Sequence, residues 1–311
     1  CKQLINAGNW RPADMILMND AERWSYTANA VIGVNRYYTG VHVGGSSGWA
    51  IDKGDFFTDI SVLQNPRAFP LNLKQVAGRA MIISESSWVP PLSFQSEGPF
   101  MVAAYSSLTG FDAFYWFTTG VAEWWQPTSA NGYTAAIGKW VFATPELLGN
   151  FPAAALMFRQ HYIARGKPVV REQRPLNAMW QRIPPIIAED PGYDPNRDLG
   201  RAAALSNLPR GVNPLAFLIG PVEVEYDGAM TNSFATDLTP YIDAKRKLIK
   251  SVTGELIMDC GHEVCLLNAP KAQGVTGFLD RMGAFKLRDV VIRTSNTYAT
   301  IIVVALDDQP L

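Results

Sequence analysis

The sequence predicts an α/β fold over its first half and an all-β domain toward its C-terminus. Two observations lead to this prediction. Short, almost continuous apolar runs alternate with helical patterns up to Gly166, which is typical of βα units around a parallel sheet covered on both faces. Beyond residue 214, short runs of alternating polarity are separated by Gly, Asn, Asp and Pro turns, which indicates an antiparallel sandwich.

The predicted strands of the first half are four short apolar runs. Their sequences are ADMILMND (13–20), NAVIGVNRYY (29–38), GRAMIISES (78–86) and GFDAFYWF (110–117). Runs of this length, bounded by turn residues, read as buried strands.

Two predicted helices accompany these strands. The first covers 97–110, where apolar residues recur at helical spacing between Ser96 and Gly110. The second covers 144–166, with Thr144 as its cap and Pro145 in its first turn, and Pro152 is expected to break it.

Changes in composition divide the chain into three parts. Residues 1–166 form the α/β part. Residues 167–214, rich in Pro, Arg and Asp without a sustained period, are expected to be a connector, and residues 215–311 the β-sandwich domain.

Composition narrows the class of protein. The chain has 311 residues, 48% of them hydrophobic, and a formal charge of −1 from 27 basic and 28 acidic residues, without blocks of like charge. This balance argues against nucleic acid as a partner. No apolar run approaches the roughly 20 residues of a membrane-spanning helix. Three cysteines do not form a disulfide framework, and the CGHEVC spacing lacks further ligands for a zinc site.

Polar and aromatic residues gather where the predicted strands end. Asn35, Tyr37 and Tyr38 end the second strand, Glu85 the third, and Trp116 the fourth. Because ligands of parallel α/β domains bind at the carboxyl ends of the strands, we expect these side chains to converge. A carboxylate, phenols, an amide and indoles suit a sugar site, since aromatic faces stack on pyranose rings while polar groups bind hydroxyls. The simpler reading of Glu85 is a solvated charge or a helix cap.

The runs VNRYY, IISESSW and FYWF resemble the sixth, seventh and eighth strands of retaining glycoside hydrolases of the large (β/α)8-barrel clan, near its β-galactosidase and agarase branches. The resemblance implies that residues 1–166 are strands five to eight of a barrel, and that the C-terminal part is an accessory β-sandwich. It further implies Glu85 as the nucleophile, Tyr37 or Tyr38 as the hydroxyl that holds its charge, and Trp116 as the floor of the innermost sugar subsite. Of the two tyrosines, Tyr38 is the expected catalytic partner.

Other side chains are expected to line the same mouth. Trp88 follows Glu85 by three residues, and Trp124 with Trp125 would form an outer sugar platform, although a packed loop anchor is an equal alternative. The expected substrate-binding residues are Asn35, Tyr37, Trp88, Trp116, Trp124 and Trp125.

The predicted reaction is hydrolysis of a glycosidic bond in a poly- or oligosaccharide with retention, without metal or organic cofactor. It needs two carboxyl groups about 5–5.5 Å apart. The clan's acid/base glutamate ends the fourth strand, so it is expected upstream of Cys1 or on a second chain; in another register Asp20 would take its place. The alternative function is a non-catalytic protein that keeps the sugar cleft. Extracellular or periplasmic localisation is expected, and Cys1 fits the mature end of a lipoprotein.

Two further motifs have competing interpretations. Glu97 precedes a helical run, where a carboxylate favours the helix dipole, so capping is preferred to catalysis. GGSSG around Ser46 matches the nucleophile elbow of serine hydrolases, but the following residues show no helical period. A serine esterase is therefore not expected.

Overall fold

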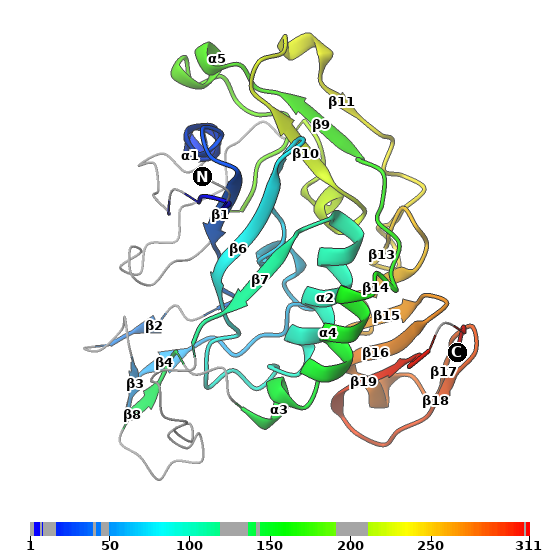
Figure 1. Cartoon of the computed structure of the whole chain (residues 1–311). Coiled ribbons are helices and arrows are strands. Elements are labelled where there is room, and N and C mark those ends of the chain that lie inside the picture. The colour runs from blue at the N-terminus through cyan, green and yellow to red at the C-terminus, as the bar shows by residue number, and fades with distance from the viewer. Residues whose placement is uncertain are drawn as a thin grey trace.

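A computed structural model of the chain describes residues 3–6, 8, 17–39, 42–44, 50–118, 136–140, 144–190, 211–307 and 309–311. Within these ranges β-sheets dominate and the helices are short (Figure 1). The predicted fold class, half a (β/α)8 barrel followed by a β-sandwich, is therefore wrong.

The first departure from the barrel is at the predicted strand 13–20. Residues 13–16 lie outside the described ranges, and Asn19 and Asp20 open helix α1 (Asn19–Tyr26) instead of ending a strand. Acidic side chains in the first turn of α1, those of Asp20 and Glu22, suit the positive end of a helix.

The second departure follows strand β1 (Val31–Asn35). Between β1 and β6 (Ala80–Ser86) the described residues form short strands and one 3-10 turn, so the regular alternation of strand and helix that a barrel needs is interrupted. These elements are β2 (His42–Val43), β3 (Ala50–Asp52), β4 (Phe56–Phe57), η1 (Pro66–Ala68) and β5 (Gln75–Val76).

A three-stranded parallel sheet does form from the predicted strands within 29–38, 78–86 and 110–117. Its order is β1-β6-β7, where β7 is Ala113–Trp116. Ile32 pairs with Met81, and Ile82 pairs with Ala113. Helix α2 (Glu97–Thr109) connects β6 to β7, which confirms the helix predicted over 97–110. Gly110 ends it with φ 85°, a left-handed conformation that glycine adopts without steric cost.

Helix α2 is enclosed between two sheets (Figure 1). All 13 of its residues are buried. Gly98 lies against the rings of Trp88 and Trp116 at the parallel sheet, whereas the Phe100 ring lies against Gly274 of the antiparallel sheet. A helix that is apolar on every side belongs in such a layered core.

The antiparallel sheet beside α2 has six strands in the order β12-β13-β14-β15-β16-β19. Helices α2 and α4 (Phe151–Arg159) pack against this sheet at β16 and β19, and a small hairpin lies over a cluster that includes Val264 and Val275. Helices therefore occupy the place where the predicted sandwich needs its second sheet. The elements are β12 (Ile242–Asp243), β13 (Leu248–Lys250), β14 (Leu256–Asp259), β15 (Val264–Asn268), β16 (Ala272–Phe278), η4 (Leu279–Arg281), β19 (Tyr298–Val304) and the hairpin β17 (Phe285–Lys286) with β18 (Val291–Ile292).

A mixed sheet joins distant parts of the chain in the order β11-β9-β10-β5. Strand β9 (Val170–Gln173) lies within the predicted connector 167–214 and pairs in parallel with β10 (Val222–Glu225). Helix α5 (Leu176–Trp180), η2 (Pro214–Leu218), η3 (Met230–Asn232) and β11 (Phe234–Ala235) complete this region.

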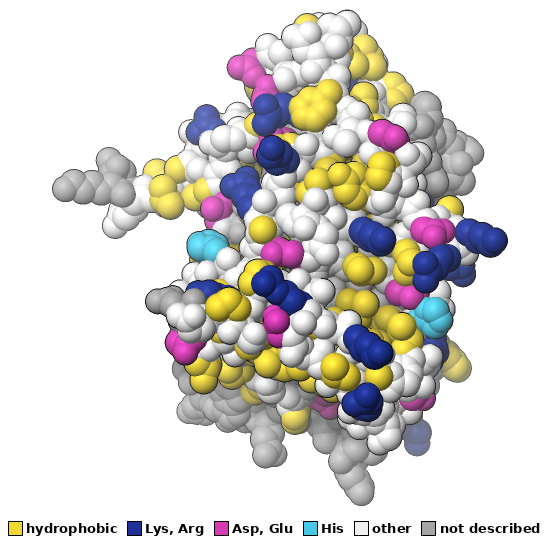
Figure 2. Space-filling model, turned by 90° about the vertical axis from the view of Figure 1, so that its right-hand side faces the viewer, with side chains coloured by type: hydrophobic (Ala, Val, Ile, Leu, Met, Phe, Trp, Pro, Cys, Tyr) yellow, Lys and Arg dark blue, Asp and Glu magenta, His cyan; other side chains and the backbone are white. Residues whose placement is uncertain are grey.

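The second predicted helix, 144–166, is divided as expected from its internal proline. It forms α3 (Pro145–Leu148) and α4 (Phe151–Arg159), and residues 160–166, predicted to continue the helix, are not helical. Strand β8 (Ala136–Gly138) pairs with β3. Among the described residues the structure holds no helix whose length and hydrophobicity would let it cross a membrane. On the face that Figure 2 shows, basic, acidic and hydrophobic side chains are interspersed.

Candidate functional site

Glu85 lies at an irregularity near the end of β6. Asn35 of β1 pairs with Glu85, while the preceding Val34 pairs with Ile83, so β6 carries one extra residue at this point. The alternation of buried and half-buried side chains along β6 breaks here, and Ser84 and Glu85 are both half-buried. Such bulges re-aim side chains and occur next to active sites.

Glu85 accepts a hydrogen bond from the Tyr37 hydroxyl, with 2.7 Å between the hydroxyl oxygen and Oε2. Tyr38, expected to be this partner, instead donates to the main-chain oxygen of Ile60 at 3.0 Å and is fully buried. The partner of Glu85 is therefore Tyr37 rather than Tyr38. Successive residues of an extended strand point to opposite faces, so the two hydroxyls cannot serve the same carboxylate.

An aromatic cluster surrounds Tyr37. The Tyr37 ring meets the Trp140 ring edge-on at 5.1 Å between centroids, and Phe117 lies 6.3 Å from it. Val89 completes this cluster. The rings hold the Tyr37 hydroxyl in the direction of Glu85. Trp140 was not among the site residues that the sequence predicted. The pattern that could have indicated it is the short apolar run after Lys139, which begins with this tryptophan.

Lys139, next to Trp140, is fully buried. Burial lowers the pKa of Lys139 to about 8, against the attraction of Asp55. Its ammonium group is thus closer to losing a proton near neutral pH than an exposed lysine is.

Asn35, predicted to bind substrate, is buried, and its side-chain oxygen accepts a hydrogen bond from the Ser84 hydroxyl at 2.9 Å. The neighbouring Arg36 donates through its main chain to the Glu85 carbonyl oxygen at 3.1 Å. These two hydrogen bonds join the end of β1 to β6 at Ser84 and at Glu85.

Trp88, predicted to line the sugar site, lies in the core instead. It has no exposed surface, and its ring packs 5.3 Å from the Tyr38 ring and 5.7 Å from the Trp116 ring. A spacing of three residues places Trp88 on the opposite face from Glu85, which explains why it turns into the core. Trp116 is half-buried among Trp88, Phe114 and Phe151. Trp124 and Trp125, together with Ser46, lie outside the described residues.

Glu97 lies in the first turn of α2, where a carboxylate is expected, but its carboxyl group accepts hydrogen bonds from residues outside the helix. It is fully buried at the start of α2, and four donors surround it: the Ser61 hydroxyl, the Val62 main-chain N–H at 2.8 Å, the Trp88 indole N–H at 3.1 Å and the Tyr298 hydroxyl at 2.7 Å. Burial raises the pKa of Glu97 even though these hydrogen bonds oppose it. The carboxyl group joins three parts of the core.

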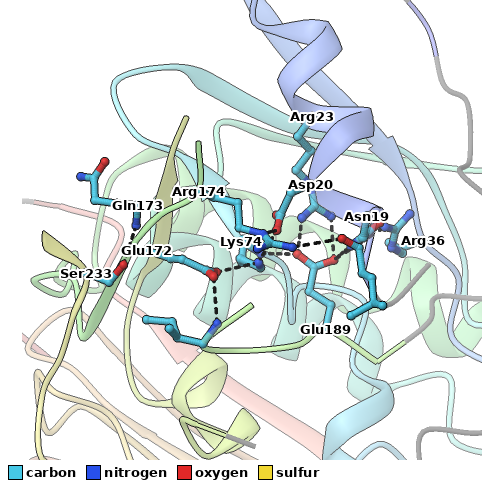
Figure 3. A network of polar contacts seen from close by, with 12 residues as sticks. Asn19, Asp20, Arg23, Arg36, Lys74, Glu172, Gln173, Arg174, Glu189 and Ser233 are labelled. Carbon is cyan, nitrogen blue, oxygen red and sulfur yellow. Dashed lines mark hydrogen bonds and ion pairs between the residues drawn. The ribbon is translucent and has the colours of Figure 1, made fainter. Parts of the chain in front are cut away.

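A second polar cluster lies around Lys74, whose ammonium group contacts the carboxylates of Asp20 at 2.7 Å and Glu172 at 2.8 Å (Figure 3). Arg174 also contacts Asp20, and Arg23 pairs with Glu189. All these groups are buried. Asp20 is therefore an ion-pair residue of α1, and the register that would make it the acid/base is wrong. Enclosed in this way, the cluster is suited to structure rather than to binding a substrate.

The described residues contain no group of three or more His, Cys, Asp or Glu side chains placed to hold a metal ion. What the Glu85 site offers is a half-buried carboxylate, a phenol that donates a hydrogen bond to it, and aromatic side chains beside them. Comparisons with protein-family models, with curated proteins and with solved structures find no match to this chain.

Proposed function

We propose that the protein is a glycoside hydrolase of the retaining type in which Glu85 is the nucleophile. The observation that carries the proposal is the hydrogen bond from Tyr37 to Glu85, on a bulge at the carboxyl end of a parallel sheet. A carboxylate that accepts a hydrogen bond from a phenol packed among aromatic rings is held in one orientation, as attack on a sugar requires.

In the proposed reaction a Glu85 oxygen attacks the anomeric carbon, and the bond from that carbon to the leaving oxygen breaks as the glycosyl ester forms. A general acid gives its proton to the leaving oxygen. Water then hydrolyses the ester and the configuration is retained. Tyr37 holds the Glu85 carboxylate before attack and again after the ester is hydrolysed. In this cluster Tyr37 and Trp140 are buried, so the half-buried Phe117 beside them would supply the apolar ring face that a sugar prefers.

The test is covalent trapping. Aryl 2-deoxy-2-fluoroglycosides with a dinitrophenolate leaving group do not need the general acid, so they report on the nucleophile alone. With a panel of sugar configurations, we expect the intact mass to rise by one fluoroglycosyl group for one configuration, and peptide mapping to place the group on Glu85. Glu85→Gln should not be labelled, whereas Glu146→Gln, which changes an exposed carboxylate on α3, should be labelled like the natural chain. Labelling at another carboxylate, or in Glu85→Gln, would overturn the assignment.

A carbohydrate-binding protein without hydrolysis is the second candidate. It is favoured by the hydrogen bond between Tyr37 and Glu85, because a carboxylate and a phenol held together can bind sugar hydroxyls without a second carboxyl group. Affinity for an oligosaccharide without trapping, and without loss of affinity in Glu85→Gln, would select this candidate.

A further inference from the structure

We infer that Glu97 is a positioning residue that couples the C-terminal antiparallel sheet to the Tyr37–Glu85 pair. The catalytic part of this inference rests on the proposed function. The coupling itself is a structural relationship and can be tested without any sugar.

The first link joins the antiparallel sheet to Glu97. Tyr298 opens β19, and its hydroxyl donates to Glu97 Oε2 at 2.7 Å. In the same strand Thr300 donates to the main-chain oxygen of Ser96, the residue before α2, at 2.9 Å. The C-terminal sheet thus fixes both the start of α2 and the carboxyl group that begins it.

The second link joins Glu97 to Trp88. Glu97 Oε1 accepts the indole N–H of Trp88 at 3.1 Å, and Trp88 has no exposed surface. Gly98 leaves room for this ring, since a Cβ at that position would come within 3.0 Å of it. A ring this closely packed has one position, because protein interiors leave few voids.

The third link joins Trp88 to the candidate site. Tyr38 forms an isolated parallel bridge with Trp88, and its main-chain N–H donates to the Ser87 oxygen at 3.0 Å. The two rings also pack together. Tyr37 directly precedes Tyr38, so the position of Trp88 sets the strand end that directs the Tyr37 hydroxyl toward Glu85.

The two oxygens of Glu97 have different kinds of partner. Oε1 receives two N–H donors, from Val62 and Trp88, which cannot accept a hydrogen bond. Oε2 receives two hydroxyls, from Ser61 and Tyr298, which can reverse and accept one. Glutamine at position 97 can therefore keep its oxygen toward Trp88 and its amide group toward the hydroxyls, whereas alanine keeps neither.

The test uses Tyr298→Phe, which removes one hydroxyl, with Tyr162→Phe as the matched control. Tyr162 donates to the Ala305 oxygen at the other end of β19 and does not contact Glu97. Two NMR signals are followed: the indole N–H of Trp88, and the side-chain carboxyl carbon of Glu85, assigned with Glu85→Gln. We expect both signals to shift in Tyr298→Phe and neither to shift in Tyr162→Phe.

Glu97→Gln and Glu97→Ala complete the series. Glutamine should preserve both signals and alanine should displace both. Where trapping of Glu85 occurs, its rate should fall about tenfold to a hundredfold in Glu97→Ala with binding of the reagent little changed, as expected when a reacting group is misplaced. A shift of Trp88 without a shift of Glu85, or no shift of either in Tyr298→Phe, would overturn the inference. Should the natural chain not be trapped, the proposed function fails while the NMR comparison still decides the coupling.

Discussion

Lys74 Nζ lies 2.7 Å from Asp20 Oδ2, and the two side chains are 54 positions apart and almost wholly buried. Helix α1 thereby presents charged residues to the core, where an amphipathic helix usually presents apolar ones. Its buried side chains are those of Asn19, Asp20, Ala21, Glu22, Arg23 and Tyr26. The attachment of α1 therefore depends on ion pairs, which are sensitive to the loss of either partner.

The first prediction concerns stability in acid. Burial opposes ionisation of Asp20, but Lys74, with Arg174 and Arg23, lowers its pKa below the usual 3.8. The stability from this ionised carboxylate is present above pH 3.8 and is lost as the pH falls through the lower folded pKa. Asp20→Asn should cost about 3–5 kcal/mol at pH 7, because buried Arg174 loses its carboxylate partner and Lys74 keeps only Glu172.

Urea unfolding at pH 7 and at several values below pH 4 measures this effect. Asp20→Asn should lose less stability on acidification than the natural chain does. Glu146→Gln, an exposed change on α3, serves as the control. An equal acid dependence in Asp20→Asn and the natural chain would exclude the assigned role of Asp20.

The second prediction separates Tyr37 from Tyr38. Tyr37→Phe removes the hydrogen bond to Glu85, and a hydrogen bond to a charged group contributes about 1.5–3 kcal/mol. We expect the rate of trapping at Glu85 to fall about tenfold to a hundredfold. Tyr38→Phe keeps the ring and the main-chain pairing and loses a bond to Ile60, so a much smaller effect on this rate is expected. The opposite order of the two variants would restore Tyr38 as the partner.

The third prediction concerns packing at Gly98. Alanine favours a helix over glycine by about 1 kcal/mol. At Gly98, however, a Cβ would lie 3.0 Å from Trp116 and from Trp88, and overpacking a core costs typically about 1–3 kcal/mol. Gly98→Ala should therefore lower the free energy of unfolding, measured in urea. Gly283→Ala, where no atom lies within 4 Å of the added Cβ, should not. A more stable Gly98→Ala variant would show that the rings yield easily.

The fourth prediction concerns the thiols. Burial raises the pKa of Cys260 to about 11 and that of Cys265 to about 12. Because the thiolate is the reactive form, both should be alkylated slowly at pH 8 in the folded protein and rapidly in denaturant. Peptide mapping after timed alkylation distinguishes the two sites. Fast labelling of Cys265 in the folded state would contradict the enclosed position that α2 gives it.

Local patterns predicted the parallel strands and the helix over 97–110, because apolar runs and a glycine stop are short-range signals. The strand predicted over 13–20 was wrong, because a short apolar stretch does not distinguish a strand from the residues that precede a helix. What decides α1 is its ion pairs with Lys74, Arg174 and Glu189, and contacts at that separation in sequence carry no local signal.

The candidate site was predictable in part for a similar reason. Glu85 was found because it ends an apolar run. The choice between Tyr37 and Tyr38, and the burial of Trp88, depend on which face of the strand each residue occupies. The extra residue in β6 changes the face that Glu85 occupies. The pattern of polar and apolar residues does not predict such a bulge when the neighbouring residues are all apolar or small.

The enclosure of α2 between two sheets also determines how the protein comes apart. An amide in this helix reaches solvent only when α4 or a sheet beside it is removed, so local fraying cannot expose it. The slowest hydrogen exchange in the chain should therefore be found along α2, with opening free energies equal to those of global unfolding. The parallel and antiparallel regions, different in architecture, would then melt as one cooperative unit.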